Sequence, residues 1–192
     1  MKSPNTGPNA EQIAAAACAE KDAAISAAEL IRYREAVETL FAIRSSKAIS
    51  NGMPAHASVL FESFFKHAKE HVRIFCEKLR AEVFGNECLI REAKWALTRN
   101  VRITVITQEE PEPSSFLDLL TDQNAGNRCL LRATGEMAKF KTNFTVMDSE
   151  ALRIEPDNGD VKAIAIMHAP EIASQWVRFF DQIAITLKLA AK

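Results

Sequence analysis

The chain contains 192 residues, of which 47 % are hydrophobic, and it carries a formal net charge of −1 at pH 7. This size and composition suit one folded domain with an extension and exclude a wholly disordered chain. There is no apolar run long enough to cross a bilayer and no signal-peptide pattern at the N-terminus, so we expect a cytoplasmic protein that does not contact membranes.

The first 48 residues differ in composition from the rest. Residues 1–9 are rich in Pro, Asn, Ser and Gly, which predicts disorder, whereas residues 10–48 predict a helical arm because alanine is abundant and Pro and Gly are absent. Spacings of three and four residues define a stripe along this arm: Ala23, Ser26, Leu30, Tyr33, Val37 and Leu40. We expect an interface at Leu30, Tyr33, Val37 and Leu40. The pattern leaves open whether they face the domain, a second copy or a partner protein.

Residues 49–192 predict an α/β domain, beginning with alternating helices and strands. Apolar residues between Val59 and Ala68 have helical spacing, and a strand is expected at residues 71–76. Asn86 is a suitable cap for the next helix, and the Val/Ile-rich segment 101–106 predicts a second strand. This β-α-β order is typical of a parallel sheet.

The second half of the domain predicts further strands and a closing helix. Pro111 and Pro113 interrupt the chain, and Ser114 or Ser115 can cap a short helix. Strands are expected at residues 128–133, 143–147, 151–155 and 161–167. The strands at 143–147 and 151–155 are expected to pair through a turn at 148–150. Apolar residues spaced three and four apart after Pro170 predict the final helix.

The segment from Lys141 to Asp148 carries the most specific signal. It resembles the core motif of the phospholipase D superfamily, His-x-Lys-x-x-x-x-Asp on a strand, with Asp148 retained but Lys141 and Asn143 at the His and Lys positions. The resemblance spans residues 50–185 and implies a mixed sheet flanked by helices. Ordinary members are phosphodiesterases or nucleases that bring two motif copies together. A protonated lysine has no lone pair for attack on phosphorus and an amide supplies no positive charge, so this single altered copy indicates a pseudoenzyme.

Three side chains are candidate ligand-binding groups: His56, Lys141 and Arg153. His56 lies near a predicted helix start, where it can bind an anion or pack and hydrogen-bond within the fold. Lys141 shares a strand face with Asn143, and Arg153 shares one with Glu155, with which it can pair.

No metal or cofactor is expected. His67 and His71 are four residues apart, but the predicted change from helix to strand between them removes the common face that a metal pair needs. Phosphate-loop and dinucleotide-binding motifs are absent from the sequence. The scattered cysteines have no Cys-x-x-Cys spacing and are expected to be free thiols: Cys18, Cys76, Cys88 and Cys129.

The sequence therefore favours a non-catalytic interaction or regulatory module that assembles with protein partners or with itself through the helical arm. The family resemblance implies an accessory role, for example in a bacterial defence system. Nucleic-acid binding is one alternative, because the stretch from Lys66 to Arg102 holds nine basic and five acidic residues. A residual phosphodiesterase or nuclease with substituted active-site residues is the other.

Overall fold

The computed structural model describes residues 27–122, 126–156 and 163–190. They form a seven-stranded mixed sheet with the order β1-β7-β6-β5-β2-β3-β4. The strands are β1 (Ala48–Asn51), β2 (His71–Cys76), β3 (Arg102–Thr107), β4 (Arg128–Arg132), β5 (Asn143–Met147), β6 (Ala151–Glu155) and β7 (Ala163–Ile166). The mixed α/β class expected from the sequence is confirmed.

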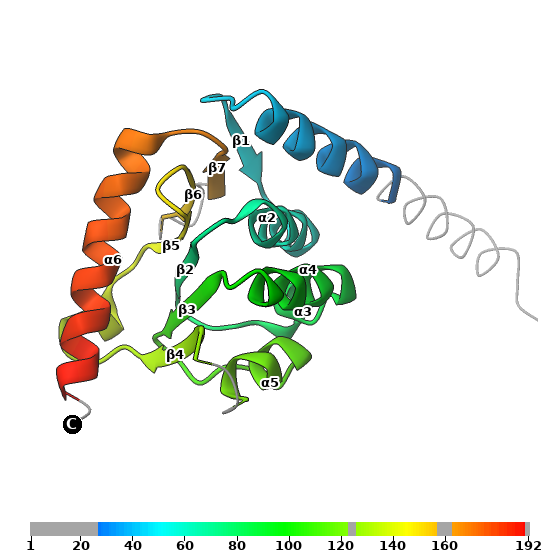
Figure 1. Cartoon of the computed structure of the whole chain (residues 1–192). Helices are drawn as coiled ribbons and strands as arrows, with labels where there is room; N and C mark the ends of the chain where they lie inside the picture. Colours follow the sequence, from blue (N-terminus) through cyan, green and yellow to red (C-terminus); the bar gives the residue numbers. More distant parts are fainter. Residues whose placement is uncertain (1–26, 123–125, 157–162, 191–192) are drawn as a thin grey trace, which may run out of the picture.

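Helices cover both faces of this sheet (Figure 1). The N-terminal helix α1 is described over residues 27–42. The other helices are α2 (Pro54–His67), α3 (Ala81–Phe84), α4 (Glu87–Thr98), α5 (Ser115–Thr121), the 3-10 helix η1 (Gly135–Lys139) and α6 (Pro170–Ala190). Helices α2 to α5 lie on one face and α6 lies on the other, while α1 lies against α2. No helix among the described residues is both long and apolar enough to span a membrane.

The sheet changes direction between β2 and β5. β2, β3 and β4 are parallel neighbours, whereas β5 pairs with β2 in the antiparallel sense, with Arg73 opposite Val146. Strand residues alternate between two cores, because successive side chains point to opposite faces. Ile74 belongs to the core beneath α2 and α4, and its neighbour Phe75 belongs to the core beneath α6.

Several local predictions are confirmed. Strands β5 and β6 have the expected limits, and they pair from Asn143 opposite Glu155 to Met147 opposite Ala151. Asn86 caps α4 by accepting from the backbone N–H groups of Cys88 and Leu89, and Ser114 caps α5.

Other segments differ from the expectation. Helix α1 ends at residue 42, and β1 begins at Ala48, within the range assigned to the arm. Asn51 and Gly52 are residue types that favour a turn, but Asn51 pairs with Ala163 as the last residue of β1. Residues 1–9, Ala23, Ser26 and Cys18 lie outside the described part of the chain, as do the first two residues of the strand expected at 161–167.

Candidate functional site

A cavity of about 620 Å³ lies on the α2 face of the sheet. Its floor is made by residues from β2, β5, β6 and the ends of β1 and β7, and its walls come from the start of α2 and from residues 77–84. Polar side chains that line the cavity include Asn51, Cys76, Glu77, Asn143, Thr145, Arg153 and Glu155. The cavity thus forms where the sheet changes from parallel to antiparallel and the chain leaves β2.

Asn143, the first residue of β5, lines this cavity. Its Oδ1 accepts a hydrogen bond of 2.7 Å from the backbone N–H of Glu77, the residue that follows β2. The side chain at the lysine position of the resembled motif therefore holds a loop in place. It carries no charge that would bind a phosphate.

Asp148 has a structural role on the turn between β5 and β6. Its φ of 53° lies in the left-handed region, which aspartate tolerates better than most residues. Its carboxylate accepts hydrogen bonds from the backbone N–H groups of Lys69, Glu70 and His71, at 3.0, 2.9 and 2.9 Å. The one retained residue of the motif ties the β5-β6 turn to the start of β2, away from the cavity.

Lys141 lies just before β5 and is exposed. It lines a neighbouring groove of about 450 Å³ together with Arg80, Asn143 and Glu155. β5 begins at Asn143, so the expected shared strand face does not extend to Lys141. Both residues line this groove, whereas of the two only Asn143 lines the larger cavity.

Arg153 is the buried cation of the cavity, with its side chain 8 % exposed. Its Nη2 donates to Glu155 Oε2 at 2.9 Å, which confirms the expected pair on one strand face. With the Asn51 amide oriented to satisfy both of its groups, Asn51 Nδ2 donates to Ala163 O, and its Oδ1 accepts from Arg153 Nε and Nη2 at 3.0 and 3.2 Å. The sequence offered no signal for Asn51, because this contact joins two strands far apart in the chain.

The charges that line the cavity are balanced. Three are positive, Lys78, Arg80 and Arg153, and three are negative, Glu77, Glu82 and Glu155. Lys78 is also paired with Glu112 outside the cavity, at 3.0 Å. The site therefore has no excess of positive charge with which to hold a phosphodiester.

Cys76 lines the cavity, but its buried thiol is not an activated nucleophile. Burial raises the pKa of its thiol to about 12, with the nearby Arg153 opposing this rise. Because the thiolate is the nucleophilic form, the thiol of Cys76 is inert at neutral pH. Cys76, Cys88 and Cys129 are free cysteines, as expected.

His56 points away from the cavity, toward α1. Its ring stacks on Tyr33, with ring centroids 4.1 Å apart and an interplanar angle of 20°. The Nε2 of His56 and the hydroxyl of Tyr33 are buried without a hydrogen-bond partner in the described structure. His56 is therefore packed, as one of the two expectations had it, but its Nε2 lacks the hydrogen bond that was expected with that packing. Anion binding by His56 stays a prediction.

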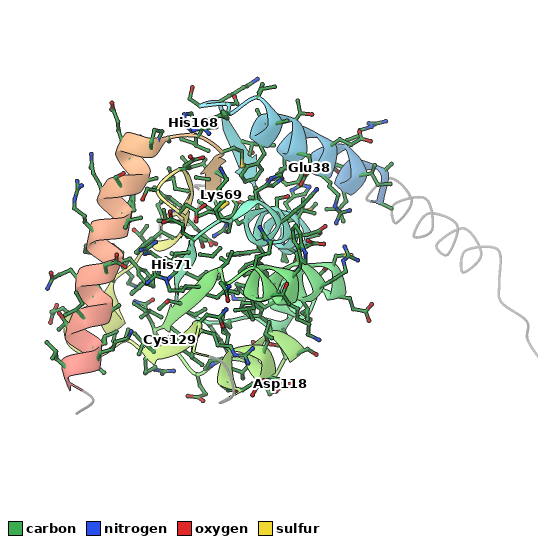
Figure 2. All side chains as sticks on the ribbon, in the orientation of Figure 1. Glu38, Lys69, His71, Asp118, Cys129 and His168 are labelled. Atoms are coloured by element: carbon green, nitrogen blue, oxygen red, sulfur yellow. The ribbon has the colours of Figure 1, made fainter. Side chains whose placement is uncertain are left out.

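The expected interface residues of α1 lie against the domain. Val37 is fully buried, and Leu30, Tyr33 and Leu40 pack on the core beneath α2. Glu38 adds a polar anchor, since its carboxylate accepts from Ser63, Lys66 and His67 of α2. Figure 2 shows Glu38 on the side of α1 that meets α2. A partner contact at this stripe stays a prediction.

The basic stretch from Lys66 to Arg102 is largely engaged within the fold. Arg99 donates to the carbonyl groups of Phe65, Lys66 and Ala68 and so caps the end of α2. The other residues with ion pairs are Lys66 with Glu38, Arg73 with Asp181, Lys78 with Glu112, Arg80 with Glu77 and Glu82, and Arg91 with Glu92. The net positive charge that this stretch presents at the surface is therefore smaller than the excess of basic over acidic residues counted along the sequence.

No cluster of three or more His, Cys, Asp or Glu side chains that suits a metal ion occurs in the part of the chain that the structure describes. His67 ends α2 and His71 begins β2, so they lie on different elements. His71 Nε2 lies 2.9 Å from Thr104 Oγ1 beneath α6, on the sheet face opposite the cavity.

No protein-family model and no curated protein sequence matches this chain. Solved structures do. The phospholipase D family member Nuc from Salmonella typhimurium matches with a TM-score of 0.51 and 14 % identity, over 71 % of this chain and 93 % of Nuc. NucT from Helicobacter pylori matches with a TM-score of 0.51 and 11 % identity, over 72 % and 95 %. TrmBL2, an archaeal chromatin protein with a novel mode of DNA binding, matches with a TM-score of 0.50 and 10 % identity, over 90 % of this chain and 66 % of its own. At these identities the likeness concerns the fold, and the chain shares the α/β fold of the phospholipase D family member Nuc.

Proposed function

We propose that this protein is a non-catalytic module with a phospholipase D-like fold, which acts by binding and assembles with protein partners. The observation that carries the proposal is the hydrogen bond between Asn143 and the backbone of Glu77. Asn143 stands at the phosphate-binding position of the motif, and this hydrogen bond gives it a structural role. Arg153, the buried cation nearby, is held by Glu155 and Asn51.

The cavity also contains no activated nucleophile among the described residues that line it. The thiol of Cys76 has a raised pKa, and the candidate base His56 stacks on Tyr33 of α1. A phospho-enzyme needs a nucleophile with a free lone pair beside positive charge. These features support binding rather than turnover.

Turnover is the first test. The full chain is incubated with bis(p-nitrophenyl) phosphate and with single- and double-stranded DNA and RNA, with and without divalent cations. We expect no hydrolysis above a buffer blank. Hydrolysis that disappears in both Lys141→Ala and Asp148→Asn, with both variants shown to be folded by circular dichroism, would establish the residual phosphodiesterase instead.

Assembly is the second test, and exposed residues of α1 allow it without disturbing the core. Ile31 of α1 is 56 % exposed, and Ile43, in the turn that follows α1, is 67 % exposed, although both are apolar. We expect Ile31→Glu to weaken co-purification of a protein partner or self-association by at least tenfold. Arg32→Glu, on the adjacent exposed position, is the matched control. Equal recovery of the same partners by wild type and Ile31→Glu would count against assembly through this helix.

Nucleic-acid binding is the second candidate, favoured by the structural match to TrmBL2. The ion pairs that Lys66, Arg73 and Lys78 form with acidic residues outside the stretch oppose it, because they offset part of its positive charge. DNA binding that weakens steeply with salt would support this candidate, since phosphate contacts release counterions. Binding that is absent at low salt would eliminate it.

A further inference from the structure

We propose that the cavity is a binding site for a small, uncharged, hydroxyl-bearing molecule. This inference rests on the proposed non-catalytic function and names the ligand class of the same site. The volume of the cavity, about 620 Å³, lies within the range of about 300–1,000 Å³ that is usual for small-molecule sites.

The charge of the lining excludes a strongly charged ligand as the best fit. The formal charges of the three cations and three carboxylates that line the cavity sum to zero. A phosphate would meet Glu155 and Glu77 beside Arg153, and a cation would meet Arg153 and Lys78 beside the carboxylates. An uncharged molecule carries no such penalty, because it leaves the existing ion pairs intact.

Polar groups of the floor remain for such a ligand. Among the described residues, the hydrogen bonds of Arg153 use Nε and Nη2, which leaves the two N–H groups of Nη1. Asn143 uses Oδ1 to hold the loop, which leaves the donor Nδ2. Glu155 binds Arg153 through Oε2, which leaves Oε1 as an acceptor. A hydroxyl group both donates and accepts, so neighbouring hydroxyls match this mixture.

The opposite wall is apolar. Phe61 of α2 and Phe84 of α3 lie with ring centroids 4.7 Å apart, and both line the cavity with Val83. Arg153 lies 5.7 Å from the centroid of the Phe61 ring, so the polar floor and the aromatic wall meet there. A ring with hydroxyl groups at its edge and C–H groups on its face satisfies both surfaces.

Thermal unfolding of the full chain tests the proposal with D-glucose, maltose and myo-inositol as uncharged probes. Inorganic phosphate and a thymidine dinucleotide are the charged probes. We expect at least one uncharged probe to raise Tm, by about 3 °C at about ten times its Kd, while the charged probes leave Tm unchanged.

Two variants locate the effect. Asn143→Asp keeps the acceptor that holds Glu77 but replaces the Nδ2 donor with a negative oxygen, and it should weaken binding at least tenfold. Ala163→Leu fills the cavity from β7 and should abolish the shift. Gln175→Glu on α6 makes the same isosteric change on the other side of the sheet, and it should bind like wild type.

Three results would overturn the proposal. These are no shift with any uncharged probe, a shift with the charged probes alone, and a shift that persists unchanged in both Asn143→Asp and Ala163→Leu. Hydrolysis of bis(p-nitrophenyl) phosphate is measured on the same samples. Hydrolysis would refute the non-catalytic function itself, whereas missing sugar binding without hydrolysis refutes the ligand class and leaves that function standing.

Discussion

Asn143 Oδ1 lies 2.7 Å from the backbone nitrogen of Glu77 and accepts its N–H. This contact joins the first residue of β5 to the loop that leaves β2, and both residues line the cavity. In the motif that the sequence resembles, the same position carries a lysine that binds phosphate. An ammonium group has no acceptor, so a lysine here would lose the contact that shapes the loop.

Replacement of this acceptor should loosen the loop. We expect Asn143→Ala to lower the free energy of unfolding by about 1 kcal/mol, the usual net value of one hydrogen bond, and Asn143→Lys to lower it by at least as much. Urea unfolding measures both. Asn143→Asp, which retains an acceptor, should keep most of the stability, and a full loss of stability in that variant would contradict the assigned role.

Asp148 should be far more important for stability than for chemistry. Its carboxylate binds three backbone N–H groups at the start of β2, so Asp148→Ala should cost about 3 kcal/mol. Asp148→Asn keeps Oδ1, which binds the N–H groups of Glu70 and His71, and tolerates the left-handed backbone, so it should cost about 1 kcal/mol. Equal losses in the two variants, measured by urea unfolding, would show that the hydrogen bonds are not the cause.

The attachment of α1 should depend on Glu38. Burial raises the pKa of this carboxyl, but hydrogen bonds from Lys66, His67 and Ser63 outweigh it and hold the pKa below its ordinary value. A lowered pKa means that the stabilisation is complete above the unfolded-state pKa and is lost as pH falls through the folded-state pKa. We expect Glu38→Gln to destabilise the protein by about 1 kcal/mol at neutral pH.

Amide hydrogen exchange in residues 27–42 measures this attachment directly. Protection of α1 should fall in Glu38→Gln, because helix opening becomes easier when the anchor is weakened. Glu35→Gln changes an exposed glutamate on the same helix and should leave exchange unchanged. The same loss of protection in both variants would argue for a general effect of charge on the helix.

His71 should make the protein sensitive to mild acid. Burial lowers its pKa to about 3, with help from the positive charges of Arg73 and Arg102 and against the opposing effect of Asp181. Between about pH 6.5 and pH 3 the unfolded chain binds a proton that the folded chain does not, so the free energy of unfolding falls as pH falls. This single group contributes up to about 1.4 kcal/mol per pH unit within that window.

Urea midpoints across this window provide the measurement. His71→Gln removes the titrating group, so its stability should fall less steeply than that of wild type between about pH 6.5 and pH 5. Thr104→Val, which removes the neighbour of Nε2 but keeps the histidine, should retain the steep dependence. Parallel curves for wild type and His71→Gln would show that another group causes the acid sensitivity.

Local sequence was sufficient for much of the secondary structure. The caps Asn86 and Ser114 satisfy backbone groups within three residues of themselves, so their effect is visible in a short window. The turn at Asp148 and the alternation on both sides of it defined β5 and β6 for the same reason. β1 was not predicted, because a strand of four residues carries little pattern and exists here through its pairing with β7.

The sequence by itself determined that Lys141 and Asn143 replace the residues that phosphodiester chemistry requires, because side-chain type sets basicity and charge in any fold. It also placed Arg153 and Glu155 on one strand face, through the two-residue period of a strand. Tertiary structure alone decided that Asn143 binds the loop at Glu77, that Asn51 meets Arg153, and that the stripe of α1 packs on α2. These contacts join segments far apart in the chain, so no local pattern records them, and their geometry depends on the whole sheet being assembled.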